Sequence, residues 1–490
     1  MKNKKIYLEP VSKKISTDFI TPVSAYSLFK DDRYSLLLES AQKGRTGRYS
    51  ILGFAPRTVY EIEENQVICK ERTSSGYRES EKVKTSRPMD YIGKIISSCT
   101  IKDGAGINGF SGGLVGYAGY EMIGEWEDIK FNNPSLAGIP EGVFLFTDEF
   151  IVFDHLFNTA RVIKLIERKE NRTAAAERID KIIEKLNGAK MPVNSVPEDP
   201  GENISYSSNF SRDEFIQSVK KIKRHIREGD IIQGVLSQRF SAEVAVDPFN
   251  YYRALRMINP SPYMFYLKLG GIKLCGSSPE VMAKLTGRTG HGTSCGCRAI
   301  VRPIAGTRPR PQLKDIDEEK KLSLDLKEDK KEQAEHTMLV DLARNDLSRV
   351  CAAGTVKTLN LMSVEKFSHV MHMVTDVEGQ LKEGKTGIDL FKAAFPAGTV
   401  SGAPKLRAME IIEEAEPDRR GPYAGALGYF SFDGNMDTAI VIRTMLISSG
   451  KVYIQAGAGI VADSVPEKEY SETVSKAEAL FEAVKMGNRI

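Results

Sequence analysis

Short apolar runs separated by turn residues dominate the first third of the chain, up to about residue 165. Runs of this length, bounded by Gly, Asn, Asp and Ser, are typical of β-strands. They lie at residues 34–38, 49–53, 67–70 and, with alternating polarity, 144–153. The polar segment 172–186 then predicts a helix. Residues 187–208 are rich in Pro, Asn, Ser and Gly, which indicates a linker between domains.

The second half of the chain opens with clear helix signals. Ser211 and Glu214 have the spacing of a capping box, and apolar residues recur every three or four positions from there to Gly229. This pattern predicts a helix that ends at the glycine. The elements expected next are a strand at residues 231–240, a helix at 247–258 and strands at 263–269 and 272–275.

The last third mixes long helices with strands. A charged helix is expected at residues 317–344, and a final helix begins near Pro466, because proline fits the first turn of a helix. The strands expected between them lie at residues 364–374, 423–432, 438–447 and 452–456, the last three as a meander with tight turns. Helices and antiparallel strands without strand–helix–strand alternation predict an α+β fold.

Length and composition indicate a soluble globular protein of two units. A chain of 490 residues exceeds one ordinary core, so we expect one unit at residues 1–190 and another at 205–485. The net charge of +4 gives no reason to expect a nucleic-acid partner. The absence of a long apolar run argues against a membrane span or signal peptide, and six scattered cysteines favour the cytoplasm. His291, Cys295 and Cys297 lack a second ligand pair, so a hairpin tip is expected there rather than a zinc site.

The most distinctive local segment is residues 302–310, where three arginines lie near a glycine, a threonine and two prolines. The prolines stiffen the backbone, and the guanidinium groups suit an anionic small molecule. Taken alone, the segment favours an ordinary basic surface loop.

Two pairs of glutamates have helical spacing. Glu332 and Glu335 lie in the expected charged helix, and Glu469 and Glu472 lie in the last helix, with Lys476 one turn further. Residues three apart share a helical face, so two such faces brought together would supply oxygen ligands for Mg²⁺. The alternative is that these carboxylates are simply solvated.

Further candidates lie in a strand and in two glycine-containing loops. His369 and His372 are three apart in an expected strand, so only one of them can face a given pocket. The loop at residues 395–405 leads into a helix whose N-terminus suits a carboxylate. The Gly-Ala-Gly sequence at 457–459, expected just after a strand, could let a ligand approach the backbone. A structural histidine and plain turns are the alternatives.

Together these segments resemble the chorismate-utilising enzymes, most closely the large subunits (component I) of the anthranilate synthase family. The matching segments, in the family's order, are residues 276–280, 302–310, 335–346, 395–405, 421–429, 439–443 and 455–473, with a looser match at 36–40 and 47–50. The chain departs from the family's usual residues at Gly234, Pro311 and Ser348. The resemblance implies antiparallel β-sheets packed as a sandwich with flanking helices. It also implies a regulatory, tryptophan-binding region within residues 1–190 and a catalytic region within 205–485.

The reaction implied by this resemblance converts chorismate and ammonia into anthranilate and pyruvate with Mg²⁺, as the first step of tryptophan biosynthesis. The chain contains no Gly-x-Cys-x-Gly sequence typical of a glutaminase. A separate glutamine amidotransferase subunit is therefore expected to supply the ammonia, within a heterotetramer. Feedback inhibition by tryptophan is also implied.

The resemblance assigns roles to individual residues. Mg²⁺ would be held by Glu335 and Glu472, with Glu332 and Glu469 in or near its ligand shell. The chorismate ring would be lined by the catalytic residues His372, Thr399 and Glu280, with Glu280 protonating the departing 4-hydroxyl. The other substrate-binding residues would be Gly306, Thr307, Tyr423, Arg443, Gly457, Ala458, Gly459 and Lys476. Tryptophan would bind at Glu39, Ser40, Pro262, Tyr263 and Met264.

Two positions separate the reactions within the family. Aminodeoxychorismate synthases usually carry a lysine where this chain has Ala305, and isochorismate and salicylate synthases carry a water-activating lysine where it has Gln233. With neither lysine, external ammonia is the expected nucleophile. The alternatives are aminodeoxychorismate synthase component I and isochorismate synthase, and more distantly a non-catalytic ligand-binding regulatory subunit.

Overall fold

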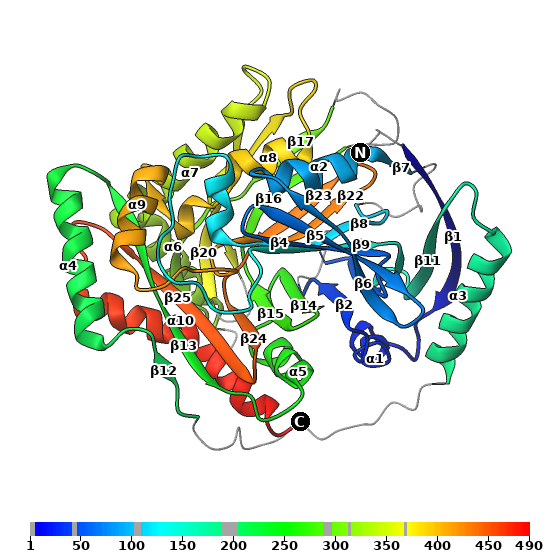
Figure 1. The fold of residues 1–490 in the computed structure, drawn as a ribbon. Helices are drawn as coiled ribbons and strands as arrows, with labels where there is room; N and C mark the ends of the chain where they lie inside the picture. Colours follow the sequence, from blue (N-terminus) through cyan, green and yellow to red (C-terminus); the bar gives the residue numbers. More distant parts are fainter. Residues whose placement is uncertain are drawn as a thin grey trace.

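The computed structural model describes residues 5–41, 47–101, 109–188, 204–287, 296–311, 315–366 and 370–490. In these ranges the strands form two large sheets, one of 13 strands and one of 12, with helices around them (Figure 1). Neighbouring strands are antiparallel, apart from the parallel pair of β1 and β7 within the described ranges. The expected α+β fold with antiparallel sheets is confirmed.

The 13-stranded sheet runs in the order β12 (Ser207–Ser208), β13 (Gln233–Glu243), β25 (Lys451–Ile460), β24 (Thr444–Ser448), β15 (Ile272–Ser278), β14 (Tyr263–Leu269), β2 (Tyr34–Glu39), β3 (Tyr49–Phe54), β10 (Glu149–Asp154), β11 (Thr159–Glu167), β1 (Ile6–Ser16) and β7 (Cys99–Ile101), with β21 (Gly402–Ala403) beside β13. The 12-stranded sheet runs in the order β18 (Ile304–Pro309), β20 (Val370–Gln380), β17 (Arg298–Val301), β16 (Val281–Thr286), β23 (Met436–Ile440), β22 (Ala426–Ser431), β8 (Gly113–Ala118), β9 (Gly142–Thr147), β4 (Thr58–Glu63), β5 (Gln66–Thr73) and β6 (Gly76–Lys84), with β19 (Lys357–Lys366) beside β20.

The helices are α1 (Pro22–Ser27), α2 (Pro88–Ser98), α3 (Arg172–Asn187), α4 (Arg212–Glu228), α5 (Pro248–Ile258), α6 (Ile316–Glu328), α7 (Lys330–Val350), α8 (Gly387–Ala394), α9 (Lys405–Ala415) and α10 (Pro466–Gly487), with short 3-10 helices at Tyr120–Glu125 and Gly398–Val400. In the part of the chain that the structure describes, none of the helices has both the length and the apolar composition needed to cross a bilayer.

Both sheets contain strands from both halves of the chain. In the 13-stranded sheet β2 pairs with β14, and in the 12-stranded sheet β8 pairs with β22. Whether residues 1–190 and 205–485 form separate units therefore stays a prediction. Most of the expected linker, residues 189–203, lies outside the described ranges.

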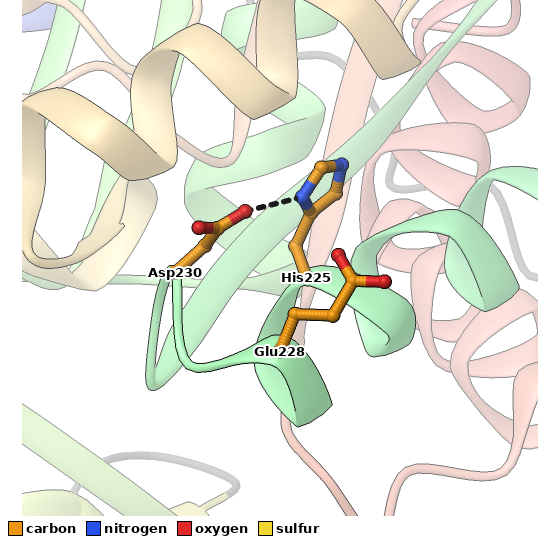
Figure 2. A group of neighbouring side chains, drawn as sticks. All are labelled: His225, Glu228 and Asp230. Atoms are coloured by element: carbon orange, nitrogen blue, oxygen red, sulfur yellow. Dashed lines mark hydrogen bonds and ion pairs between the residues drawn. The ribbon is translucent and has the colours of Figure 1, made fainter.

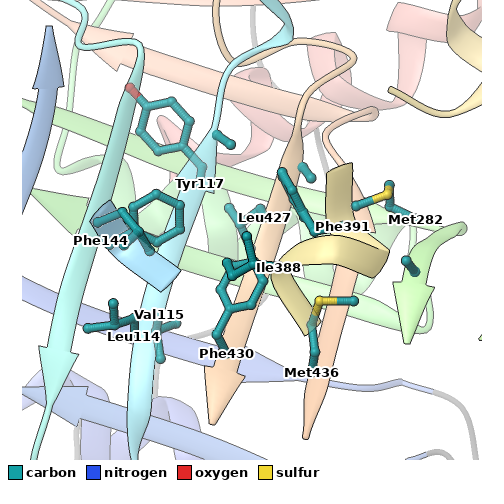
Figure 3. Packing of buried hydrophobic residues seen from close by; sticks show 14 of the residues in the cluster. Leu114, Val115, Tyr117, Phe144, Met282, Ile388, Phe391, Leu427, Phe430 and Met436 are labelled. Atoms are coloured by element: carbon teal, nitrogen blue, oxygen red, sulfur yellow. The ribbon is translucent and has the colours of Figure 1, made fainter. Parts of the chain in front are cut away.

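The core is packed in layers because strand side chains alternate between the two faces of a sheet. Leu36 joins the large apolar cluster to which both sheets contribute, whereas its neighbour Leu37 joins a second cluster with α3, α5 and α10. The 13-stranded sheet is therefore buried on both faces. Figure 3 shows the large cluster where Phe391 of α8 lies beside Leu427 and Phe430 of β22.

The local signals at α4 are confirmed. Ser211 Oγ accepts a hydrogen bond from Glu214 N at 3.3 Å, and Glu214 Oε2 accepts one from Ser211 N at 2.8 Å. Gly229 ends the helix with φ of 85°, in the left-handed region where glycine has no steric penalty.

The single helix expected at residues 317–344 is corrected to two helices, α6 and α7. Asp329 separates them in an extended conformation, with φ of −65° and ψ of 111°. Its carboxylate accepts hydrogen bonds from Lys331 N and Glu332 N. The sequence did not reveal this break between the helices. An aspartate in a highly charged segment can equally be a surface residue within one helix or the N-cap of a new one.

Three strand predictions are also corrected. Residues 364–374 include the end of β19 and the start of β20, which pair antiparallel, rather than one strand, and His369 lies outside the described residues. Residues 144–153 and 438–447 each cross from one sheet to the other, at Asp148 and at Val441–Arg443 respectively. The expected meander is therefore divided between the two sheets. Sequence alternation does not reveal such a crossing, because both strands at each crossing are buried throughout or nearly so.

Candidate active site

Helices α7 and α10 bring the four predicted glutamates together. Burial raises the pKa of Glu335, and the charge of Glu472 on the other helix raises it further. Burial and the charge of Glu335 likewise raise the pKa of Glu332, and burial with the charge of Glu472 raises that of Glu469. The carboxylates of the two helices are therefore near enough for their charges to act on one another, and their role as metal ligands stays a prediction.

This carboxylate cluster is only partly neutralised by the chain itself. Lys476 Nζ lies 2.6 Å from Glu472 Oε1, and Arg308 Nη1 lies 3.5 Å from Glu332 Oε1. Hard oxygen ligands with excess negative charge suit a divalent cation that keeps some of its waters. The chemistry of these residues therefore fits such an ion, although among the described residues no three of their carboxylate oxygens lie within 4.8 Å of one another.

Lys476 connects the carboxylate cluster with the other predicted residues. Its Nζ donates to the carbonyl oxygen of Gly457 in β25 at 3.0 Å. Its charge also lowers the pKa values of Glu280 and His372, which lie on other elements. Residues 457–459 lie inside β25 rather than after it, which corrects the expected position of this glycine-containing segment.

Glu280 lies at the turn between β15 and β16, and only 6% of it is exposed. Burial raises the pKa of its carboxyl group to about 8, although the nearby Thr399 hydroxyl, the Ile304 N–H and Lys476 oppose the rise. The Thr399 hydroxyl is itself buried, and its contact with the carboxyl falls short of hydrogen-bond geometry. A carboxyl group that keeps its proton at neutral pH can act as a general acid.

His372 in β20 is held by the neighbouring strand β18. Its Nδ1 lies 2.9 Å from the carbonyl oxygen of Gly306 and 3.2 Å from Thr307 Oγ1. Since a carbonyl oxygen only accepts, Nδ1 carries the proton, and burial lowers the pKa of the ring. Gly306 has φ of 70°, and a Cβ there would lie 2.9 Å from Glu332 Oε2, so glycine is required.

Arg443 supplies a partly buried positive charge. It lies where the chain crosses between the sheets, with φ of 50°. Burial lowers the pKa of its guanidinium, and among the described residues no carboxylate pairs with it. A partly buried guanidinium without an acidic partner suits a carboxylate ligand. Tyr423 lies nearby, and its hydroxyl would be 2.8 Å from a Cβ at position 457, where the chain has glycine.

The arginines of residues 302–310 have a different role from the one expected. They pair with acidic side chains of the protein: Arg302 with Glu365 and Asp376, Arg308 with Asp325 and Asp329, and Arg310 with Glu319. The expectation that these guanidinium groups serve a small anion is therefore corrected. Spacing alone gave no sign of these partners, which lie on α6, next to it at Asp329, and on β19 and β20.

The two segments predicted to bind tryptophan meet in the 13-stranded sheet, where Glu39 of β2 pairs with Met264 of β14. The Glu39 carboxylate accepts from the Tyr252 hydroxyl at 2.6 Å and pairs with Arg256 at 3.0 Å. Ser40 Oγ is buried without a hydrogen-bond partner in the described ranges. Sequence reasoning missed Tyr252 and Arg256, whose spacing of four on α5 was the available signal.

The side chains of Tyr263 and Met264 lie on opposite faces of the 13-stranded sheet. The Tyr263 hydroxyl donates to Asp437 of the 12-stranded sheet at 2.9 Å. Met264 instead packs in the cluster on the opposite face of the 13-stranded sheet. Strand alternation separates the side chains of these two neighbours, and the binding of tryptophan at Tyr263 stays a prediction.

Sequence reasoning also missed a buried ion pair beneath the loop at residues 395–405. Arg420 donates to both carboxylate oxygens of Glu416, at 2.6 and 2.9 Å. It also donates to the carbonyl oxygens of Val400 and Val235, at 2.7 and 2.6 Å. These bonds tie the loop that carries Thr399 to β13. Nothing in the sequence distinguished Arg420 from other arginines.

A second group with metal-binding residue types lies at the end of α4. Figure 2 shows His225, Glu228 and Asp230, whose ligand atoms all lie within 4.8 Å of one another. His225 Nδ1 lies 2.7 Å from Asp230 Oδ2, and Arg407 donates to the same oxygen at 3.3 Å. Asp230 N also donates to the carbonyl oxygen of His225, so this group closes the helix end.

Comparisons with known proteins agree with this geometry. Residues 33–482 match the family described as chorismate binding enzyme. The chain is 44% identical to anthranilate synthase component 1 of Acetivibrio thermocellus, over 98% of this chain and 96% of that protein. It is 43% identical to the protein of the same name from Thermus thermophilus, over 98% of each. The crystal structure of anthranilate synthase component I from Streptococcus pneumoniae superposes with a TM-score of 0.77 at 34% identity, covering 96% of this chain and 99% of that one. The resemblance seen in the motifs is confirmed: the chain belongs to the family of chorismate-binding enzymes.

Proposed function

We propose that this protein is the large subunit of an anthranilate synthase, which converts chorismate and ammonia into anthranilate and pyruvate. Full-length relatives that carry the name anthranilate synthase component 1 support this proposal. The observation that carries it is the buried Glu280 carboxyl. Burial raises its pKa to about 8, so the group keeps its proton at neutral pH, and it lies near Thr399 and the charge of Lys476. The reaction needs such an acid because a ring hydroxyl must leave.

The proposed binding of chorismate uses opposite charges on the two sides of the site. Arg443 binds one substrate carboxylate, since it is partly buried and has no acidic partner among the described residues. Tyr423 and residues 457–459 line the same side of the site, with Lys476 holding the carbonyl oxygen of Gly457. His372 and Thr399 line the ring.

Glu335 and Glu472 are the proposed Mg²⁺ ligands, with Glu332 and Glu469 in or near the ligand shell. When bound, Mg²⁺ neutralises the ring carboxylate of chorismate and draws negative charge away from the ring during the reaction. The mutual repulsion of the glutamates, seen in their raised pKa values, supports this assignment.

The chain's own groups then move the protons. Ammonia forms a bond to one ring carbon with its lone pair, while the C–O bond of the 4-hydroxyl breaks at another. Glu280 gives its proton to that oxygen, which departs as water. The nitrogen loses one proton to solvent, and elimination of pyruvate makes the ring aromatic.

A second subunit and a regulator complete the proposal. The relatives' name, component 1, supports a partner component. We propose that this partner is a glutamine amidotransferase that supplies ammonia, in a heterotetramer, and that tryptophan inhibits the enzyme by binding near Glu39 and Ser40.

The test is to incubate the pure chain with chorismate, Mg²⁺ and ammonium at mildly alkaline pH and to identify the product. Fluorescent anthranilate supports the proposal. Aminodeoxychorismate or isochorismate as the product would assign the chain to one of the alternative reactions. Glutamine should replace ammonium only after an amidotransferase subunit is added.

A further inference from the structure

We infer that Glu121, in the first half of the chain, is a positioning residue for the substrate-binding turn at residues 420–425; this inference rests on the proposed function. Glu121 lies in the 3-10 helix Tyr120–Glu125 and is partly buried. Its Oε1 accepts a hydrogen bond from Arg420 N at 2.6 Å, and its Oε2 accepts one from Gly421 N at 3.0 Å. One carboxylate therefore holds two successive N–H groups of a segment that lies about 300 residues further along the chain.

The same 3-10 helix also holds the other side of Gly421. Tyr120 N donates to the carbonyl oxygen of Gly421 at 2.8 Å. The two segments approach so closely that a Cβ at position 119 would lie 3.0 Å from this oxygen. The peptide groups before and after Gly421 are thus both bound by the first half of the chain, which fixes the direction in which the turn leaves this residue.

The turn needs such support because part of its backbone is strained. Gly421 and Ala424 both have φ of 62°. Glycine adopts this left-handed conformation freely, whereas in alanine the Cβ crowds the following carbonyl oxygen. A turn with a strained residue keeps its shape only when neighbouring groups hold it. The hydrogen bonds to Glu121 and Tyr120 supply that hold.

Tyr423 converts the position of the turn into affinity for the substrate. Its hydroxyl would lie 2.8 Å from a Cβ at position 457, so it faces the glycine-containing segment of β25. The guanidinium of Arg420 lies 5.7 Å from the ring centroid of Tyr423 and 4.6 Å from that of Tyr120. A displaced turn therefore displaces Tyr423, and Glu121 acts on chorismate through that side chain.

The test is the Glu121→Ala variant, which removes both acceptors. Loss of two hydrogen bonds to a carboxylate predicts an increase of about tenfold or more in the KM for chorismate. The kcat and the KM for ammonia should change by no more than about twofold, because Tyr423 binds substrate and transition state alike. Glu121→Gln keeps one acceptor and turns an amide nitrogen toward Gly421 N, so its chorismate KM should rise by about threefold to fivefold. If Glu121→Ala does not fold, Glu121→Gln carries the test.

Glu413→Ala is the matched control. Glu413 is partly buried like Glu121, and its Oε1 accepts hydrogen bonds from two successive backbone groups, Asn132 N at 2.6 Å and Asn133 N at 2.8 Å. It also joins the two halves of the chain, but the backbone that it holds carries none of the proposed substrate-binding residues. This variant should lower the melting temperature without raising the KM for chorismate.

A double variant shows whether Glu121 acts through Tyr423. Tyr423→Phe removes the hydroxyl that faces position 457 and should itself raise the KM for chorismate. Adding the Glu121 substitution to Tyr423→Phe should then raise this KM by no more than about a further twofold, because residues that act through one contact are not additive. Effects that multiply in full would overturn the inference.

The remaining outcomes separate the inference from the proposed function. An unchanged chorismate KM in Glu121→Ala, an equal rise in Glu413→Ala, or a fall in kcat without a rise in KM would overturn the inference while the parent still makes anthranilate. The loss of chorismate can be followed whatever the product is, so a parent that forms another product would overturn only the proposed function. A parent that consumes no chorismate would overturn both.

Discussion

Replacing Glu280 by glutamine tests whether its carboxyl group is protonated in the folded protein. Burial raises its pKa from 4.5 to about 8, and one pKa unit corresponds to about 1.4 kcal/mol, so ionising this group costs the folded state roughly 5 kcal/mol. The folded state binds the proton more tightly than the unfolded state does. The parent therefore loses unfolding free energy as pH rises from 4.5 to about 8, and no more above that.

Glutamine has nearly the same shape and cannot ionise, so the Glu280→Gln variant escapes this loss. Relative to the parent, its unfolding free energy should rise by about 4 kcal/mol between about pH 5 and about pH 8.5. Urea unfolding of both proteins, in chelator and without substrate, measures this difference. Turnover of the variant should fall by about 100-fold to 10,000-fold, as expected when a general acid is removed.

A stability difference that stays constant across this pH range would refute the assignment of a protonated Glu280. Glu478→Gln is the matched control, because Glu478 is an exposed carboxylate on α10. The free energy of unfolding of this control should follow that of the parent at every pH, since solvated charges contribute little. A pH-dependent difference in the control would show that the slope does not come from Glu280.

Three further predictions concern the metal, the regulator and the buried ion pair. Glu335→Gln should reduce turnover at least about 100-fold, yet leave the urea midpoint in chelator unchanged or higher, because it removes a carboxylate whose pKa is raised by burial and by Glu472; full activity in excess chelator would contradict this. Ser40→Phe should fill the space beside its unpaired hydroxyl and relieve tryptophan inhibition with little change in uninhibited turnover; undiminished inhibition would place the tryptophan site elsewhere. Arg420→Met should lower the free energy of unfolding by about 3–5 kcal/mol, because it leaves the Glu416 carboxylate buried without its partner, and a loss below about 1 kcal/mol in urea unfolding would contradict this.

Local signals in the sequence predicted the elements that local chemistry controls. The capping box at Ser211 and the proline near the start of α10 gave correct helix starts, because a cap depends on a few neighbouring residues. The helical spacing of Glu332 and Glu335 correctly placed both on α7. These predictions needed no knowledge of the rest of the chain.

The errors arose where distant segments decide the structure. The chain passes from one sheet to the other at Asp148 and near Arg443, and no local pattern marks such a crossing. The arginines of residues 302–310 looked available because their acidic partners come from α6, β19 and β20. The pairing of Arg420 with Glu416 and two backbone carbonyls likewise depends on tertiary contacts.

The interleaving of the two halves in both sheets has a consequence for the synthesis of the protein. Gly116 of β8 pairs with Gly428 of β22, so more than 300 residues separate these partners. At translation rates of about 5–20 residues per second, β8 is synthesised roughly 15 to 60 s before β22, the strand with which it pairs. During that interval the nascent chain exposes an apolar strand edge, which invites pairing with other chains. Both sheets can close only once the C-terminal strands have emerged, so chaperone capacity should govern the yield of this polypeptide more than its final stability does.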